Sequence, residues 1–293
     1  MISSYTAAQI AAAETLVMAE LPEGELMARA AQAAANVILR ELRTRRGLAS
    51  GASVTLLVGT GNNGGDALFA GARLAGRGVA VKAIATGNRV HPEGLKAFEK
   101  AGGHLYTISE GGPGTYAPIE QVTEQARHCD VIVDALLGIG SRGPLSGHAA
   151  GLVTTLIVEA GLDAPPRYRR DTRPLVVAID LPSGIGVDDG AVGGQVLPAD
   201  ITVTFGAYKP AALLPPASGL FGRIELVNLG LTEALAEAGA PSADRLEPGD
   251  VLDLWPVPRR TDHKYSRGVL GVVAGSETYP GAAVLTAAAA VKT

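Results

Sequence analysis

The sequence is poor in cysteine and in aromatic residues, and it lacks long apolar runs and basic blocks. The single cysteine, Cys129, has no partner for an internal disulfide and no second thiol for a zinc cluster, which favours a reducing, cytoplasmic setting. Aromatic residues make up 4% of the chain, too few for a base-stacking surface. No run of 18 or more apolar residues occurs, so no membrane span is expected. With a net charge of −4 and no basic block, nucleic acid is not an expected partner.

Hydrophobic residues and glycine are abundant by contrast. The 47% of hydrophobic residues can build a sizeable core, which excludes a disordered chain. Glycine accounts for 38 of 293 residues, nearly twice its usual share, without a collagen-like period. The glycines gather at a few places, which indicates tight turns where the backbone approaches a ligand.

Strands and helices are predicted to alternate along most of the chain. Two leading helices fill Thr6–Arg46, with Thr6 as a cap and a break at Pro22 and Gly24. Buried strands are then expected at 54–58, 79–85, 131–133, 175–179, 201–205 and 224–227, and helices at 66–77, 92–101, 118–128 and 147–160. Continuous apolar strands separated by amphipathic helices predict an α/β fold, a Rossmann-like three-layer αβα arrangement with a mostly parallel sheet. Ligands of such folds lie beyond the carboxyl ends of the strands.

The composition changes after Gly239. Four prolines (Pro241, Pro248, Pro256 and Pro258) fall within 18 residues, so a first domain is predicted over residues 1–240 and a linker over 241–262. A strand at 268–275 and a helix at 281–292 are expected to follow. A lone strand and helix cannot bury a core, so residues 263–293 are expected to be the start of a second, truncated domain.

A glycine-rich loop follows the first buried strand, with the sequence Gly59-Thr60-Gly61-Asn62-Asn63-Gly64-Gly65-Asp66. Amides at the start of the following helix can bind an anion, and Asp66 is predicted to cap that helix. Three of the glycines match G-x-G-x-x-G, but an NAD-dependent dehydrogenase also needs an acidic residue about 20 positions on. Residues 83–88 contain no acid, so the oxidoreductase alternative is disfavoured.

Two further strands are expected to lead into polar loops. Asp134 is predicted to end the strand 131–133 and to open a second glycine loop, and Asp180 follows the strand 175–179 in Asp-Leu-Pro-Ser-Gly. A carboxyl group leaving a buried strand into a cleft is suited to general acid/base chemistry, although capping of a turn would explain it too. Lys209, after the strand 201–205, could reach substrate or be a solvated loop lysine.

These motifs, in this order, resemble the NAD(P)H-hydrate epimerase family (the YjeF N-terminal domain) over about residues 5–240. The leading helices with Leu26 and Met27 belong to the resemblance, and Ala67 departs from it, because the family usually has a further glycine there. The tail, with His263-Lys264-Tyr265-Ser266-Arg267-Gly268 and Tyr279-Pro280-Gly281, resembles the start of the ADP-dependent NAD(P)H-hydrate dehydratase domain. That domain has a ribokinase-like fold and follows the epimerase domain in bifunctional repair proteins.

The resemblance implies interconversion of the R and S forms of NADHX and NADPHX, nicotinamide cofactors hydrated at C6, by a domain that binds one potassium ion. Potassium would be held by Asn63, Asp134 and Ser183, whose side chains offer oxygen ligands. The hydrated dinucleotide would be bound by Asn62, Asn63, Gly64, Gly65, Asp66, Gly138, Ile139, Gly140, Ser141, Arg142, Gly143, Pro144 and Asp180. ADP or ATP is expected only for the missing dehydratase domain.

Asp180 is the predicted catalytic residue. Nitrogen N1 of the hydrated ring would expel the C6 hydroxyl to leave an iminium, and water would add back from the other face, with Asp180 as acid and base. Ring opening and reclosure is a second route that the residues leave open. The competing class is a catalytically silent Rossmann-like module that binds a nucleotide or a protein, which the intact acids and loops disfavour. The oligomeric state also stays open, a homo-oligomer included.

Overall fold

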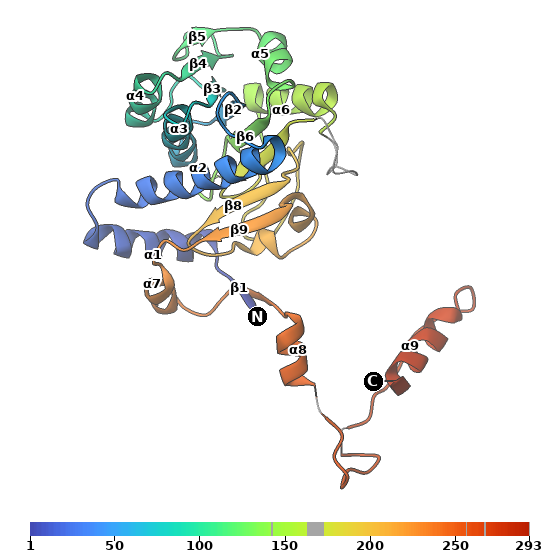
Figure 1. Cartoon of the computed structure of the whole chain (residues 1–293). Helices are drawn as coiled ribbons and strands as arrows, with labels where there is room; N and C mark the ends of the chain where they lie inside the picture. Colours follow the sequence, from blue (N-terminus) through green and yellow to red (C-terminus); the bar gives the residue numbers. More distant parts are fainter. Residues whose placement is uncertain (142, 163–172, 256, 267, 293) are drawn as a thin grey trace. The chain divides into compact units, whose positions relative to one another are not determined.

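The computed structural model describes residues 1–141, 143–162, 173–255, 257–266 and 268–292 (Figure 1). Contacts divide the chain into two compact units. The larger unit is Ile2–Arg245, and the smaller one comprises Met1 with Leu246–Thr293. The larger unit contains the eight-stranded sheet.

A parallel sheet of eight strands forms the centre of the larger unit, as far as its residues are described. The strands are β2 (Ser53–Val58), β3 (Ala80–Ala85), β4 (His104–Thr107), β5 (Thr115–Tyr116), β6 (Val131–Ala135), β7 (Leu175–Ile179), β8 (Ile201–Phe205) and β9 (Arg223–Val227). Their order across the sheet is β5-β4-β3-β2-β6-β7-β8-β9, and every neighbouring pair is parallel. The predicted α/β fold is confirmed, while the short strands β4 and β5 were not predicted.

Helices cover both faces of this sheet. On one face, α2 (Glu25–Arg46), α3 (Asn62–Ala75) and α4 (Pro92–Lys100) pack onto alternate strand residues such as Leu56. On the other face, α5 (Ile119–Ala126) and α6 (Gly147–Ala160) pack onto residues such as Leu57 (Figure 1). Because side chains alternate between the two faces, strands buried on both sides read as continuous apolar runs.

Both ends of the larger unit are tied together. Helix α1 (Ala7–Glu20) is capped by Thr6, whose side chain accepts a hydrogen bond from the Gln9 amide at 3.2 Å, so the predicted cap is confirmed. Helix α1 packs against α7 (Thr232–Glu237). Strand β1 (Ile2–Ser4) pairs antiparallel with β10 (Ala243–Arg245), so a segment predicted to be linker supplies a strand to this unit. Two short 3₁₀ helices lie between β8 and β9, at Pro210–Ala212 and Ala217–Leu220.

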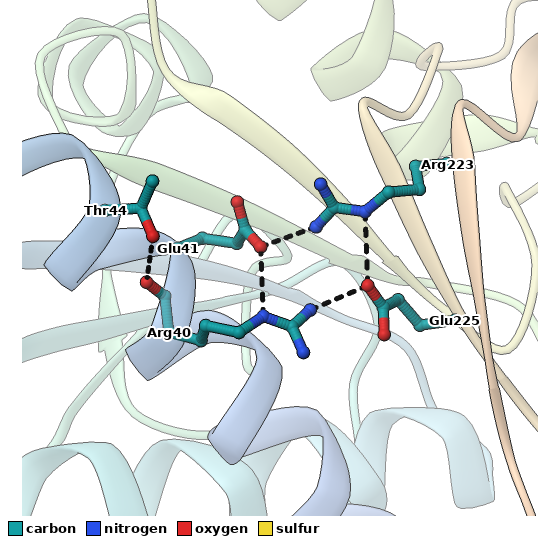
Figure 2. A network of polar contacts seen from close by, with 5 residues as sticks. All are labelled: Arg40, Glu41, Thr44, Arg223 and Glu225. Atoms are coloured by element: carbon teal, nitrogen blue, oxygen red, sulfur yellow. Dashed lines mark hydrogen bonds and ion pairs between the residues drawn. The ribbon is translucent and has the colours of Figure 1, made fainter.

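Helix α2 is also tied to the edge strand β9 by charged side chains (Figure 2). Glu225 forms ion pairs with Arg40 at 2.7 Å and with Arg223 at 3.1 Å. Glu41 forms ion pairs with the same two arginines, at 3.4 Å to Arg40 and 2.5 Å to Arg223. Exposed ion pairs contribute only about 0.2–1 kcal/mol each. The network therefore positions α2 on the sheet more than it stabilises the fold.

Helix α3 begins earlier than the sequence predicts. It runs from Asn62 with Gly61 as its N-cap, so Asp66 lies inside the helix and does not cap it. Close packing explains the difference. A Cβ on Gly64 would lie 2.4 Å from the carbonyl oxygen of Gly59, and one on Gly65 would lie 2.9 Å from the His91 ring. These two glycines therefore let α3 pack closely against Gly59 and His91. The turn predicted over residues 59–65 ends where the helix begins at Asn62.

The smaller unit contains α8 (Pro248–Leu254) and α9 (Gly281–Lys292), neither of which buries a residue. The predicted helix at 281–292 is confirmed, but the strand predicted at 268–275 is wrong, because these residues form no regular structure. A strand needs a partner for its backbone hydrogen bonds, and no described strand lies beside this segment. Among the described residues, no helix is both long and apolar enough to cross a membrane. The domain limits stay predictions.

Limited proteolysis is expected to separate the two units. Arg259 and Arg260 are exposed and lie between α8 and α9, outside any helix, so trypsin should cut there before it cuts the helices and strands of the larger unit. The product that retains β10 should keep the melting temperature of the intact chain, because β1 and β10 stay paired. Mass spectrometry would identify the cut. First cleavage within 53–141 or 173–245, or a lower melting temperature after trimming at Arg260, would contradict this division.

Candidate active site

A cavity of about 580 Å³ opens at the carboxyl ends of β2, β6 and β7, and is called here the glycine-loop cavity. Its walls include Thr60–Asn63 after β2, Leu136–Ser141 after β6, and Asp180 after β7, together with Glu14 of α1. Strand β2 leads outward to β3, whereas β6 leads the other way to β7. The cavity therefore lies at the point where the strand order reverses, where doubly wound folds bind ligands.

The N-terminus of α3 lies at this cavity. The amides of Asn62, Asn63 and Gly64 belong to the first helical turn, which has no intrahelical acceptors for them. A negative group near a helix N-terminus is stabilised by about 0.3–1 kcal/mol at exposed positions. The second loop approaches closely, because a Cβ on Gly138 would lie 3.1 Å from Asn63 Cβ. The arrangement suits a phosphate group.

Asp134 lies below these loops. The strand predicted to end at Val133 runs to Ala135, so Asp134 lies inside β6 and is fully buried. Its carboxylate accepts from the Ser183 amide at 2.8 Å, the Ser183 hydroxyl at 2.6 Å and the Leu136 amide at 3.3 Å. Burial raises the pKa of Asp134, whereas the hydrogen bonds from Ser183 and Leu136 lower it.

Asn63 joins the same cluster through Leu137. Its side-chain nitrogen donates to the carbonyl oxygens of Leu137, at 2.8 Å, and Ile179, at 3.1 Å, which leaves its side-chain oxygen as an acceptor. The Leu137 amide donates to the Ser183 hydroxyl at 2.9 Å. The structure thus brings together Asn63, Asp134 and Ser183, whose oxygens are ligands of the kind that hard cations prefer.

Asp180 is held in an unusual conformation beside a buried lysine. Its φ of 68° is in the left-handed region, which is strained for a residue with a side chain. Its carboxylate forms an ion pair with Lys209, which is 1% exposed, and accepts from the Phe205 amide at 3.2 Å. Lys209 also donates to Thr204 Oγ1 and to the Phe205 carbonyl, both at 2.9 Å. Lys209 is therefore not a solvated loop lysine.

Two more carboxyl groups line the cavity with Asp180. Burial raises the pKa of Asp66 well above its usual range, and the charges of Asp180 and Glu14 add to this effect. Burial also raises the pKa of Glu14, with a further increase from Asp180 and a decrease from Lys209. Sequence reasoning missed Glu14, because only the fold brings the leading helix over the strand ends.

The other predicted site residues are distributed around this cavity. Its lining contains Asn62, Asn63, Asp66, Gly138, Ile139, Gly140, Ser141 and Asp180. Gly64 and Gly65 pack within α3, and Gly143 and Pro144 lie further along the second loop, outside the residues that line the cavity. Arg142 lies outside the described residues. Cys129 is buried, and burial raises the pKa of its thiol to about 11, in agreement with a core residue.

Comparison with known proteins yields one family and several relatives. The model of the family described as YjeF-related protein N-terminus matches residues 23–211. A bifunctional NAD(P)H-hydrate repair enzyme, Nnr, of Mycobacterium leprae is 41% identical over 98% of this chain and 53% of its own length. An NAD(P)H-hydrate epimerase of Clavibacter michiganensis is 40% identical over 78% of this chain and 90% of its own length. The chain thus spans about half the length of the bifunctional relatives.

A solved structure supports the fold. The crystal structure of yeast ynu0 matches with a TM-score of 0.62 and 17% identity, over 84% of this chain and 98% of the yeast chain. At this level of identity the likeness concerns the fold alone. Because the family model covers more than half of the residues and the relatives reach 41% identity, the chain belongs to the family of YjeF-related protein N-termini.

Proposed function

We propose that this chain is an NAD(P)H-hydrate epimerase that interconverts the R and S forms of NADHX and NADPHX. The observation that carries the proposal is the glycine-loop cavity, in which an anion-binding helix end and Asp180 lie together. Relatives named NAD(P)H-hydrate epimerase match this chain over up to 90% of their own length, which supports the assignment. The dehydratase activity, with ADP or ATP as its cofactor, is proposed only for the longer bifunctional proteins.

Two carboxyl groups divide the proton transfers in the proposed mechanism. Asp66, whose raised pKa favours its neutral form, gives its proton to the C6 hydroxyl, which leaves as water while N1 forms the C=N bond of the iminium. Asp180, ion-paired with Lys209, remains a carboxylate beside the positive ring. A second water adds to C6 from the other face and transfers its proton to Asp180. Exchange of protons with solvent restores both groups.

Potassium is proposed as the resident cation of the domain. A fully buried carboxylate with no cationic side chain among its described partners requires a proton or a metal ion to neutralise it, as at Asp134. Asn63 and Ser183 supply further oxygens beside it. A bound ion would hold the loops after β2, β6 and β7 in one arrangement, and no catalytic step depends on its chemistry.

The epimerase proposal is tested by a coupled assay. Purified R-NADHX is incubated with this chain and with a dehydratase specific for the S form, and the return of NADH is followed by absorbance. The chain should accelerate conversion of the R form beyond its spontaneous rate. Recovery of NADH at the spontaneous rate would leave only a binding module.

Replacing Asp66 by Asn is expected to stabilise the fold at neutral pH and to reduce activity. The native state holds the Asp66 proton to a higher pH than the unfolded chain, where the pKa is near 3.8. The native state therefore binds more protons, and the free energy of unfolding falls as the pH rises through the raised pKa. The amide escapes this loss but cannot donate an acid proton.

Melting temperatures measured from pH 4 to pH 8 check this prediction. The melting temperature of the variant should exceed that of wild type most at the highest pH, and this difference should shrink toward pH 4. The matched control is Asp253→Asn, at an exposed position in α8. A constant difference across the range would exclude titration of Asp66 as its cause.

A further inference from the structure

A second cavity of about 580 Å³ lies where α1 turns into α2, and is called here the elbow cavity. Its lining includes Met18, Leu21 and Met27 from the elbow, Phe69 and Arg73 from α3, and His91 before α4. This volume falls within the roughly 300–1,000 Å³ that small-molecule sites occupy. None of the residues predicted to bind the substrate lines it.

The two cavities share a wall. Met18, Leu26 and Met27 line both of them, so they adjoin beneath the same elbow. On the opposite side, one face of α3 runs past both cavities. Asn62 and Asp66 line the glycine-loop cavity, and Phe69 and Arg73 line the elbow cavity.

The spacing of these four residues places them on one helical stripe. Successive steps of four, three and four residues keep side chains on one face. At about 1.5 Å per residue, the stripe from Asn62 to Arg73 is roughly 16 Å long. A ligand whose phosphates lie at the start of α3 could extend along this stripe and fill both cavities.

The chemistry of the elbow cavity suits a nucleoside base. Phe69 and His91 meet edge to face with ring centroids 5.7 Å apart, and methionines provide adaptable apolar contacts. The two carboxylates Glu23 and Glu93 exceed the single positive charge of Arg73, which donates to Gln32 at 2.8 Å. A neutral aromatic ring fits this lining better than a phosphate, which the helix N-terminus receives.

We propose that the elbow cavity binds the adenosine half of the dinucleotide whose hydrated nicotinamide half occupies the glycine-loop cavity. The adenosine site stands on its own geometry, and only the placement of the nicotinamide half rests on the proposed function. The phosphates at the α3 N-terminus then join a nicotinamide half in the glycine-loop cavity to an adenosine half in the elbow cavity. A nicotinamide mononucleotide, which cannot reach the elbow cavity, binds more weakly than the dinucleotide.

The test compares binding of NAD⁺, nicotinamide mononucleotide and AMP, measured by titration calorimetry or ligand-observed NMR. Ala28 is a half-buried helix residue lining only the elbow cavity, so Ala28→Phe fills that cavity. Wild type should bind NAD⁺ more tightly than the mononucleotide. Ala28→Phe should weaken the binding of AMP and NAD⁺ by about tenfold or more, as expected when one buried apolar contact is lost. The affinity for nicotinamide mononucleotide should stay unchanged.

The matched control is Ala12→Phe, an exposed position on α1 that lines neither cavity, which should bind all three ligands as wild type does. A second test is Phe69→Leu, which removes the ring but keeps an apolar side chain. This variant should also weaken AMP binding. Equal wild-type affinities for NAD⁺ and the mononucleotide, or AMP binding indifferent to both cavity variants, would overturn the proposal. Absence of epimerisation with this binding pattern intact would refute the proposed function alone.

Discussion

Replacing Asp180 by Asn is expected to lower kcat for epimerisation by roughly 10²–10⁴-fold, or about 3–5 kcal/mol of transition-state stabilisation. The amide can neither take the proton of the adding water nor balance the charge of the iminium ring. Asn is the appropriate replacement, because among residues with side chains it tolerates the left-handed conformation that Asp180 adopts at φ 68°. Steady-state kinetics on R-NADHX measure the effect.

The same substitution leaves the Lys209 ammonium buried without its counter-charge. Breaking a buried ion pair at one partner costs about 3–5 kcal/mol of stability. The double variant Asp180→Asn/Lys209→Met removes both charges and should regain much of that stability, as thermal unfolding would show. If Asp180 acts in catalysis, the double variant remains inactive although it is folded. Near-normal turnover in either variant would refute the catalytic role.

Replacing Asp134 by Asn is expected to remove the dependence of activity on potassium. An amide has one acceptor oxygen where the carboxylate has two, so one donor among Ser183 and Leu136 is left without a partner. Such a loss costs about 1–3 kcal/mol of stability. It also removes the buried negative charge that would attract a cation.

Initial rates in potassium and sodium chloride at equal ionic strength test this prediction. Wild type should be faster in potassium, and Asp134→Asn should be slower and equal in both salts. Ser183→Ala, which removes one hydroxyl and no charge, should weaken the potassium effect without abolishing it. A wild type that responds equally to the two cations would argue against the ion site.

The sequence predicted those elements whose residues carry their own pattern. The strands β7 and β8 and helix α6 have the predicted bounds, because β-branched apolar runs and amphipathic periodicity are local properties. The pairing of β1 with β10 was not predicted, because it joins segments more than 230 residues apart. The start of α3 was misplaced, because close packing against Gly59 and His91 overrides the low helix propensity of glycine.

The site was predictable where its residues follow strands. Asp180 and the two glycine loops lie at strand ends, where parallel folds bring distant segments together. The residues that set the chemistry of Asp180 and the loops were harder to predict from the sequence. Glu14 comes from a leading helix whose position depends on α7 and the elbow, and the burial of Lys209 follows from packing around Asp180. These features arise from tertiary contacts that no local pattern encodes.

The most direct measurement is the rate at which purified R-NADHX becomes the S form in ¹⁸O-labelled water, followed by chromatography and mass spectrometry. We expect acceleration over the spontaneous rate, with one solvent oxygen entering at C6 in each conversion, and loss of this acceleration in Asp180→Asn. Conversion at the spontaneous rate would contradict the epimerase assignment. Fast conversion with the original oxygen retained would contradict the iminium mechanism.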